Sequence, residues 1–197
     1  MIEDKILILD DVIDEAILEG FVEMLPFMKD SLPRNDEWAN YSNRWFPPSN
    51  TPIPNTISKL LRSKKILEPA RKKGDLSWKW FVLDITHPFE VQITDYAKDT
   101  DHYEWHVDHF FEAHNDKPAT NRLLNYIFYL IEPQTGGELE LANDETLKHV
   151  PGHGYEFFDT VKIKPKKNRM VLMSSWIPHR VLPSKGRRVT INGHVGI

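Results

Sequence analysis

The chain has 197 residues, a net charge of −4 and no cysteine. A chain of this length can bury about 70% of its unfolded surface, so we expect a single domain, residues 1–197, whose core needs no disulfides. The near-neutral charge argues against nucleic acid as the main partner, and the lack of cysteine excludes thiolate metal ligands.

The sequence predicts neither membrane insertion nor export. No stretch approaches the roughly 18 consecutive apolar residues that a membrane-spanning helix needs. The first residues, Met-Ile-Glu-Asp-Lys, are acidic and are not followed by a long apolar segment, so we expect no signal peptide. These features predict a soluble, cytoplasmic protein with no membrane partner, and they leave the oligomeric state open.

The N-terminal part of the chain is expected to be mainly helical. Residues 5–9 predict a strand, and Asp10 or Asp11 is the expected N-cap of the helix that follows. Residues 31–55 are rich in proline, asparagine and aromatic residues, which indicates irregular backbone. Residues 56–72 predict a second helix. The apolar residues assigned to the buried faces of the two helices are Val12, Ile13, Ala16, Ile17, Phe21, Ile57, Leu60, Leu61 and Leu67.

Short apolar and aromatic segments, separated by glycine and proline turns, dominate the rest of the chain. The predicted strands are residues 78–85, 89–96, 103–111, 123–131, 138–141, 170–174, 179–182 and 189–195. Many short strands split by turns are typical of a sandwich or barrel. We therefore predict a mainly β fold, with a strand core over residues 78–197 and helices from residues 1–77 covering one outer face of a sheet.

Three residues have the chemistry of a metal site. His106 and Asp108 are two apart in a predicted strand, so their side chains should share one face, with Trp105 and Val107 on the other. A second predicted strand can bring His179 to the same point. Two imidazoles and one carboxylate leave metal positions open, which suits non-heme Fe(II) and oxygen chemistry.

A second His-x-Asp pair, His114 and Asp116, competes for the same role. Chance alone supplies about one such pair in a chain with this composition, so the pattern by itself is weak. The residues after His114 are typical of a solvated turn, whereas His106 lies in an aromatic, apolar segment. We therefore assign the metal to His106, Asp108 and His179.

Arg188 is the expected partner of an anionic ligand. The turn sequence Pro183-Ser-Lys-Gly186 predicts a hairpin in which His179 and Arg188 lie nearly opposite each other. Cross-strand neighbours have Cβ atoms about 5 Å apart, so a metal-bound dicarboxylate would bring its far carboxylate within reach of Arg188. Guanidinium suits bidentate pairing with a buried carboxylate. A surface cation on an edge strand is the alternative. Arg187 should point the other way.

These motifs resemble the prolyl-hydroxylase-like branch of the Fe(II)/2-oxoglutarate oxygenases, over about residues 89–195. The residues that carry the resemblance, besides the assigned ligands, are Tyr96, Tyr103, the segment Arg-Leu-Leu-Asn-Tyr-Ile-Phe-Tyr129-Leu, Gly136-Gly137-Glu-Leu139 and Gly186-Arg-Arg188. The resemblance implies a double-stranded β-helix, or jelly roll, of about eight core strands. It implies Fe(II), 2-oxoglutarate as co-substrate and O₂, with ascorbate as a candidate stimulant. It also implies that Tyr129 helps to hold the far carboxylate of 2-oxoglutarate and that Tyr96 lines the same pocket.

The resemblance implies a dioxygenase that hydroxylates an unactivated C–H bond, with a prolyl residue in a peptide or protein as the expected substrate. A small molecule or free amino acid is the nearest alternative, because Arg188 stands where collagen-type prolyl 4-hydroxylases usually carry lysine. Nucleic-acid dealkylating relatives usually carry a second arginine at the position of His194, so that function is disfavoured. A metal-binding jelly-roll protein without oxygenase activity would give Arg188 and Tyr129 no shared purpose.

Substrate contacts are assigned to Arg44, Trp45, Tyr103 and Trp105. Arg44 and Trp45 belong to a cluster of arginine and aromatic residues at positions 38–46. Such residues are common binding anchors, and packing against the sheet is an equal alternative. The basic segment at residues 162–169 is either a nucleic-acid patch or, as we favour, a solvated loop.

Overall fold

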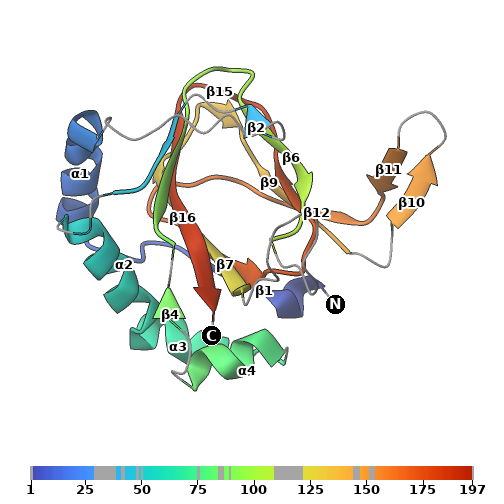
Figure 1. Cartoon of the computed structure of the whole chain (residues 1–197), viewed down its shortest axis with the longest axis horizontal. Coiled ribbons are helices and arrows are strands. Elements are labelled where there is room, and N and C mark those ends of the chain that lie inside the picture. The colour runs from blue at the N-terminus through green and yellow to red at the C-terminus, as the bar shows by residue number, and fades with distance from the viewer. Residues whose placement is uncertain are drawn as a thin grey trace, which may run out of the picture.

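Two antiparallel sheets lie face to face, as the computed structural model in Figure 1 shows. The structure describes residues 2–28, 39–40, 43–47, 49, 51–74, 76–83, 87–88, 90–108, 122–143, 147–150 and 154–196. The larger sheet contains β1 (Ile6–Leu9), β3 (Asn43–Trp45), β4 (His87–Pro88), β5 (Gln92–Tyr96), β7 (Arg122–Ile131), β13 (Met170–Ser174) and β16 (Arg188–Gly196). Its order is β1-β13-β7-β16-β5-β3, with β4 also paired to β16.

The smaller sheet supplies the opposite wall of the molecule. It contains β2 (Ala39–Asn40), β6 (His102–His106), β9 (Leu139–Ala142), β12 (Thr160–Ile163) and β14 (His179–Val181), in the order β12-β9-β14-β6-β2. Two short pairs lie outside both sheets: β8 (Thr135–Gly136) with β15 (Ser184–Lys185), and β10 (Leu147–Val150) with β11 (Gly154–Phe157). The mainly β prediction is confirmed.

Helices cover the outer face of the larger sheet, as predicted (Figure 1). They are α1 (Glu15–Met24), α2 (Pro52–Leu61), α3 (Lys64–Ala70) and α4 (Leu76–Val82), and short 3₁₀ turns form η1 (Ile2–Lys5) and η2 (Leu25–Met28). The helix expected over residues 56–72 is in fact two helices, α2 and α3. The first of these, α2, begins earlier than expected because Pro52 occupies its first turn, where a missing backbone N–H costs no hydrogen bond.

The cap of α1 also differs from the prediction. Asp14, and not Asp10 or Asp11, accepts a hydrogen bond from the backbone N–H two residues further on, at 2.9 Å. Val12 and Ile13 therefore lie before the helix, and its buried face differs in part from the prediction. Leu18 is fully buried, whereas Ile17, expected on the buried face, is 44% exposed.

The strand predicted over residues 78–85 is wrong, because residues 76–82 form the helix α4. Trp78 and Phe81, three residues apart, are both fully buried and pack edge to face, with ring centroids 6.3 Å apart. Aromatic residues favour strands on average, but packing of this helical face against the sheet overrides that preference. The strand core also reaches upstream of residue 78, since β1 and β3 belong to the larger sheet.

Alternation along β7 divides the interior into two layers. Leu124, Tyr126 and Phe128 pack in the core beneath the helices, whereas Ile127 and Tyr129 face the smaller sheet. The same rule holds along β16, where apolar residues face the helices. The intervening residues of β16 are polar and line a cavity between the sheets: Arg188, Thr190, Asn192 and His194. The gap between the sheets is therefore apolar in one part and polar in another.

The segment between β9 and β13 is more ordered than the sequence indicated, since β10, β11 and β12 were not among the predicted strands. Part of the basic segment continues β12, and the rest is ion-paired to the N-terminal region. Asp10 pairs with Lys166 at 2.9 Å and with Arg169 at 2.6 Å, and Glu15 pairs with Lys167. These three cations are therefore ion-paired with carboxylates of the N-terminal region.

Candidate metal and co-substrate site

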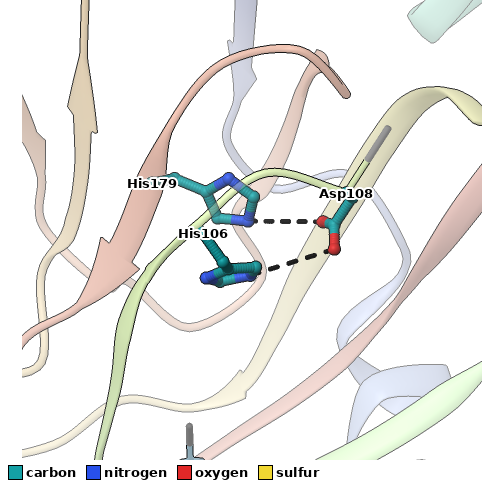
Figure 2. Close-up of side chains that lie close together, drawn as sticks. All are labelled: His106, Asp108 and His179. Carbon is teal, nitrogen blue, oxygen red and sulfur yellow. Dashed lines mark ion pairs between the residues drawn. The ribbon is translucent and has the colours of Figure 1, made fainter. Parts of the chain in front are cut away.

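The three predicted metal ligands come together in the gap between the sheets (Figure 2). His106 ends β6 and His179 begins β14, and these two residues are paired directly across the strands. Asp108 follows a bend just beyond β6, so it reaches the site from the end of the strand rather than from the strand itself. The candidate ligand atoms of all three residues lie within 4.8 Å of one another, close enough to hold one metal ion.

Backbone carbonyls set the direction of both imidazoles. The Nδ1 atom of His106 lies 2.8 Å from the Glu104 carbonyl oxygen, and that of His179 lies 2.9 Å from the Ile177 carbonyl oxygen. A carbonyl oxygen only accepts, so Nδ1 donates in each ring and Nε2 is left to face Asp108. The Nε2 atoms lie 3.9 and 3.4 Å from the Asp108 oxygens. This second-nitrogen hydrogen bond is typical of metal-binding histidines.

The electrostatics favour the protonation states that bind a metal. Burial, with the neighbouring His179, lowers the pKa of His106 to about 3, so the ring is neutral near pH 7. Burial alone would raise the pKa of Asp108, but the hydrogen bond and charge of His179 outweigh it and hold that pKa well below its usual range. A neutral imidazole and an ionised carboxylate are ready-made ligands.

A cavity opens beside these residues. Its walls are formed by Arg44, Thr94, Tyr96, Tyr103, His106, Asp108, Ile127, His179, Val181, Arg188, Thr190, Asn192 and His194. The three metal-ligand candidates come from the smaller sheet and its edge, and Arg188 comes from the larger one. A ligand in the cavity can therefore touch the metal position and Arg188 at the same time.

Arg188 is a buried cation with unused donors. Its side chain is 1% exposed, and its guanidinium carbon lies 4.7 Å from the ring centroid of Tyr96 and 5.1 Å from that of Tyr129. Among the described residues, its Nε and Nη1 atoms and the Tyr129 hydroxyl have no hydrogen-bond partner. Donors left unpaired in a buried site are costly, so this arrangement fits an anionic ligand such as the far carboxylate of 2-oxoglutarate.

The predicted hairpin between His179 and Arg188 is wrong. β14 pairs with β6 and β9, whereas β16 pairs with β5 and β7, so the two residues belong to different sheets. Ser184 and Lys185 pair instead with β8, and Gly186, at φ +82°, lets the chain turn away into the larger sheet. The two side chains line the same cavity from opposite sheets rather than as cross-strand neighbours.

Arg187 points away from the cavity, as predicted. Its guanidinium pairs with Asp95, with Nη2 2.9 Å from a carboxylate oxygen. This pairing raises the pKa of Arg187, chiefly through the hydrogen bond to Asp95.

The model of the 2OG-Fe(II) oxygenase superfamily matches residues 91–196, which include all three metal-ligand candidates and Arg188. The chain belongs to this superfamily. It is therefore a 2-oxoglutarate-dependent dioxygenase, and the cofactors of the family are Fe(II), 2-oxoglutarate and O₂. No curated protein sequence gives a match to the chain.

Solved structures of prolyl hydroxylases share the fold of this oxygenase. The match to a Pseudomonas putida prolyl 4-hydroxylase has a TM-score of 0.64 at 13% identity and covers 98% of this chain and 92% of the other. A viral collagen prolyl hydroxylase from Paramecium bursaria Chlorella virus-1 gives 0.63 at 18% identity, with 97% and 95% covered. A Trichoplax adhaerens prolyl hydroxylase, in complex with a hypoxia-inducible-factor peptide fragment, gives 0.64 at 15%, with 98% and 84% covered. The jelly-roll prediction is confirmed.

The residues assigned to substrate contact are divided between several environments in this oxygenase. Arg44 and Tyr103 line the cavity. Trp45 is instead buried in the core beneath the helices. Trp105 is not among the residues that line the cavity; its ring contacts Phe157 at a tilt, and the Arg180 guanidinium lies over it. Packing contacts within the protein therefore explain the positions of Trp45 and Trp105.

Other predictions have no counterpart in the described residues. His114 and Asp116, the competing His-x-Asp pair, lie outside the described residues, as do Trp38 and Tyr41 of the aromatic cluster. None of the helices that the structure does describe combines the length and the apolar character needed to cross a membrane.

Sequence reasoning missed several polar residues of the oxygenase site. His194 was not assigned to the site, yet it lines the cavity, and Thr190 and Asn192 lie on the same face of β16. Asn125 on β7 contacts Asp108 directly. Alternation counted from Arg188 could have found the β16 residues, because every second residue of a strand shares one face. Asn125 could not have been found this way without knowing the pairing of β7 with β16.

Proposed function

We propose that this oxygenase hydroxylates a prolyl residue in a peptide or protein, and that His106, Asp108 and His179 hold its iron. The three side chains offer two imidazole nitrogens and one carboxylate oxygen to a single point. When bound, the iron and 2-oxoglutarate supply the oxidising chemistry of the family. The protein's own part is to hold the ligands in one arrangement, orient both substrates and keep water from the reacting bond.

Arg188, Tyr129 and Tyr96 are proposed to hold 2-oxoglutarate. The observation that carries this proposal is the buried Arg188 guanidinium, whose free donors lie across the cavity from the metal ligands. The Tyr129 hydroxyl offers a further unpaired donor, and the Tyr96 ring stacks on the guanidinium. A carboxylate here would satisfy these donors together.

The substrate is proposed to enter past Arg44 of β3 and Tyr103 of β6, which line the cavity from the larger and the smaller sheet respectively. A peptide substrate is supported by the likeness in fold to a prolyl hydroxylase bound to a peptide fragment. Arginine and tyrosine are suited to holding peptide carbonyls and the apolar face of a proline ring.

A screen tests the proposal directly. The enzyme, loaded anaerobically with Fe(II) and 2-oxoglutarate, is exposed to O₂ with proline-containing peptides in one set and small molecules and free amino acids in another. We expect a mass gain of one oxygen on a prolyl residue, absent when His179→Ala replaces the wild type. Oxidation confined to free amino acids or other small molecules would overturn the peptide assignment and leave the oxygenase assignment standing.

A further inference from the structure

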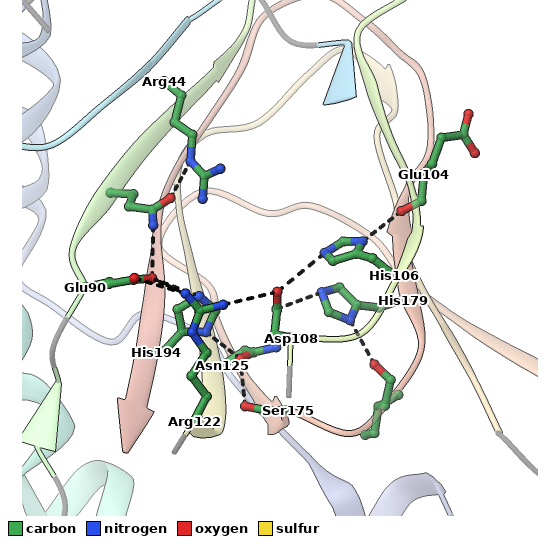
Figure 3. Close-up of polar contacts among 12 residues, drawn as sticks. Arg44, Glu90, Glu104, His106, Asp108, Arg122, Asn125, Ser175, His179 and His194 are labelled. Atoms are coloured by element: carbon green, nitrogen blue, oxygen red, sulfur yellow. Dashed lines mark hydrogen bonds and ion pairs between the residues drawn. The ribbon is translucent and has the colours of Figure 1, made fainter. Parts of the chain in front are cut away.

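A series of hydrogen-bonded polar side chains lies behind Asp108, on the side away from the two histidine ligands (Figure 3). Its first member is Asn125 on β7, which is 3% exposed and whose Nδ2 donates to the Asp108 Oδ2 atom at 2.6 Å. This is a short hydrogen bond to an ionised group, a class roughly twice as strong as neutral ones. The bond reaches Asp108 from the larger sheet, whereas the backbone of Asp108 continues from the smaller one.

The orientation of the Asn125 amide is fixed by its other contacts. Its Oδ1 accepts a hydrogen bond from the Ser175 hydroxyl at 2.9 Å and lies 2.7 Å from the His194 Nδ1 atom. The reverse orientation would place Oδ1 against the Asp108 carboxylate, where two acceptors repel. The amide N–H group therefore points at Asp108, and the surrounding groups hold it there.

His194 is held in turn from its other side. Its Nε2 lies 3.1 Å from the Glu90 Oε2 atom, so each ring nitrogen of His194 faces an oxygen atom. Arg122 also pairs with Glu90, at 3.0 Å. Burial alone would raise the pKa of Glu90, but the hydrogen bond and charge of His194, together with Arg122, hold that pKa below its usual value. The series of polar groups that starts at Asn125 thus ends at the Glu90 carboxylate, which is ionised near pH 7.

A close backbone contact sets the position of Glu90. The Tyr126 hydroxyl donates to the Glu90 carbonyl oxygen at 2.6 Å. Gly193, next to His194, approaches the same oxygen so closely that a Cβ atom there would lie 1.7 Å from it. The hydrogen-bonded side chains that link Glu90 to Asp108 are therefore held by closely packed backbone, with no space for a side chain at Gly193.

We propose that Asn125 is a positioning residue of the metal site, which orients the Asp108 carboxylate for the metal, and that His194 and Glu90 hold Asn125 in place. The need for it follows from the position of Asp108 past the end of β6, where the backbone N–H still donates to the Ser175 carbonyl oxygen at 3.2 Å but the carboxylate must be oriented by side-chain contacts. The inference rests on the proposed function, because it takes Asp108 as a metal ligand. Loss of such a supporting contact typically weakens metal binding about 10- to 100-fold.

The test uses Co(II), which reports its ligands through visible absorption bands, and the full-length apoprotein under anaerobic conditions. Co(II) affinity and the visible spectrum are measured for wild type and Asn125→Leu, a change that keeps the approximate size and removes the donor. We expect binding about 10- to 100-fold weaker and an altered spectrum. Wild-type affinity with an unchanged spectrum in Asn125→Leu would overturn the inference.

Asn168 provides the matched control. It is also a buried asparagine with both ends of its amide bonded, in this case to the Ile13 backbone, and no described contact links it to the metal ligands. Asn168→Ala should lower thermal stability and leave Co(II) affinity unchanged. Equal loss of Co(II) affinity in Asn168→Ala and Asn125→Leu would show a general effect of destabilisation and would overturn the positioning role.

A second variant covers the case in which Asn125→Leu does not fold. His194→Leu removes one of the two groups that hold the amide and leaves Ser175 in place, so it should weaken Co(II) binding by a smaller factor and shift the spectrum in the same direction. An unchanged affinity there overturns the inference. Failure of wild-type protein to bind any Co(II) would instead overturn the proposed function, so the two failures are distinguishable.

Discussion

Arg187 and Arg188 are adjacent in the chain and have opposite environments. Arg187 pairs with Asp95 on the outer side of β5, and Arg188 is buried in the cavity with unpaired donors. The cause is the alternation of side chains along an extended strand, which places neighbours on opposite faces. Two adjacent residues of the same type thus provide a test and its control at the start of β16.

Arg188→Ala should sharply raise the concentration of 2-oxoglutarate that the enzyme requires. Losing a charge-assisted contact to a buried partner costs about 2–5 kcal/mol, or about 30- to several-thousand-fold in affinity. Arg188→Lys keeps the charge but not the planar fork of the guanidinium, so its 2-oxoglutarate affinity should lie between those of wild type and Arg188→Ala. The measurement is 2-oxoglutarate affinity for the anaerobic Fe(II) complex. Arg187→Ala should leave that affinity unchanged, and the reverse result would contradict the observed register of β16.

Each of the substitutions His106→Ala, Asp108→Ala and His179→Ala should abolish Fe(II)-dependent turnover of 2-oxoglutarate, because three protein ligands are the minimum for this type of site. The measurement is anaerobic Fe(II) binding followed by turnover on admission of O₂. Wild-type activity in any of the three would remove that residue from the ligand set.

His114→Ala and Asp116→Ala are the controls for these ligand variants, since they alter the other His-x-Asp pair of the sequence. Both should retain nearly full activity. Activity as low as that of the ligand variants would mean that the metal is held by the second pair instead.

Tyr129→Phe should weaken 2-oxoglutarate binding modestly. The hydroxyl is a buried donor without a partner among the described residues, and one such hydrogen bond is worth about 0.5–1.5 kcal/mol, or roughly 2- to 12-fold in affinity. The ring and its contact with Arg188 remain, so thermal stability should not fall. Calorimetric titration of 2-oxoglutarate into the anaerobic Fe(II) complex measures the effect, and an unchanged affinity would exclude the hydroxyl as a contact.

Asp10→Asn should reduce stability near pH 7 more than in acid. Hydrogen bonds from Arg169 and Lys166 hold the pKa of Asp10 far below its ordinary value. A carboxyl whose pKa is lower in the folded state stabilises the fold above its unfolded-state pKa, and this contribution is lost as the pH falls below about 4. Because the pair is partly exposed, we expect about 0.5–1 kcal/mol near pH 7. Urea unfolding of wild type and variant between neutral and acidic pH should show the difference shrinking, and a constant difference would contradict the ion-pair account.

The sequence alone was sufficient to predict that His106, Asp108 and His179 come together and that Arg188, unlike Arg187, faces the interior. The alternation around Arg188 depends only on extended backbone, which short apolar segments specify well. Asp108 reaches the predicted place although it lies in a bend beyond β6 rather than in the predicted strand. The mainly β fold followed from the same segments. The helix at 76–82 did not, because Trp78 and Phe81 suit both a strand and a helix until the sheet beneath them is known.

Tertiary structure alone decided how these parts meet. The pairing of β14 with β6 and β9 and of β16 with β5 and β7 sets His179 and Arg188 on opposite sheets, and no local pattern could reveal this. The contact of Asn125 with Asp108 and the contact of His194 with Glu90 also join residues far apart in the chain. Such contacts depend on which strands are neighbours and in what register. That choice is set by burial over the whole fold rather than by the residues on either side of each partner.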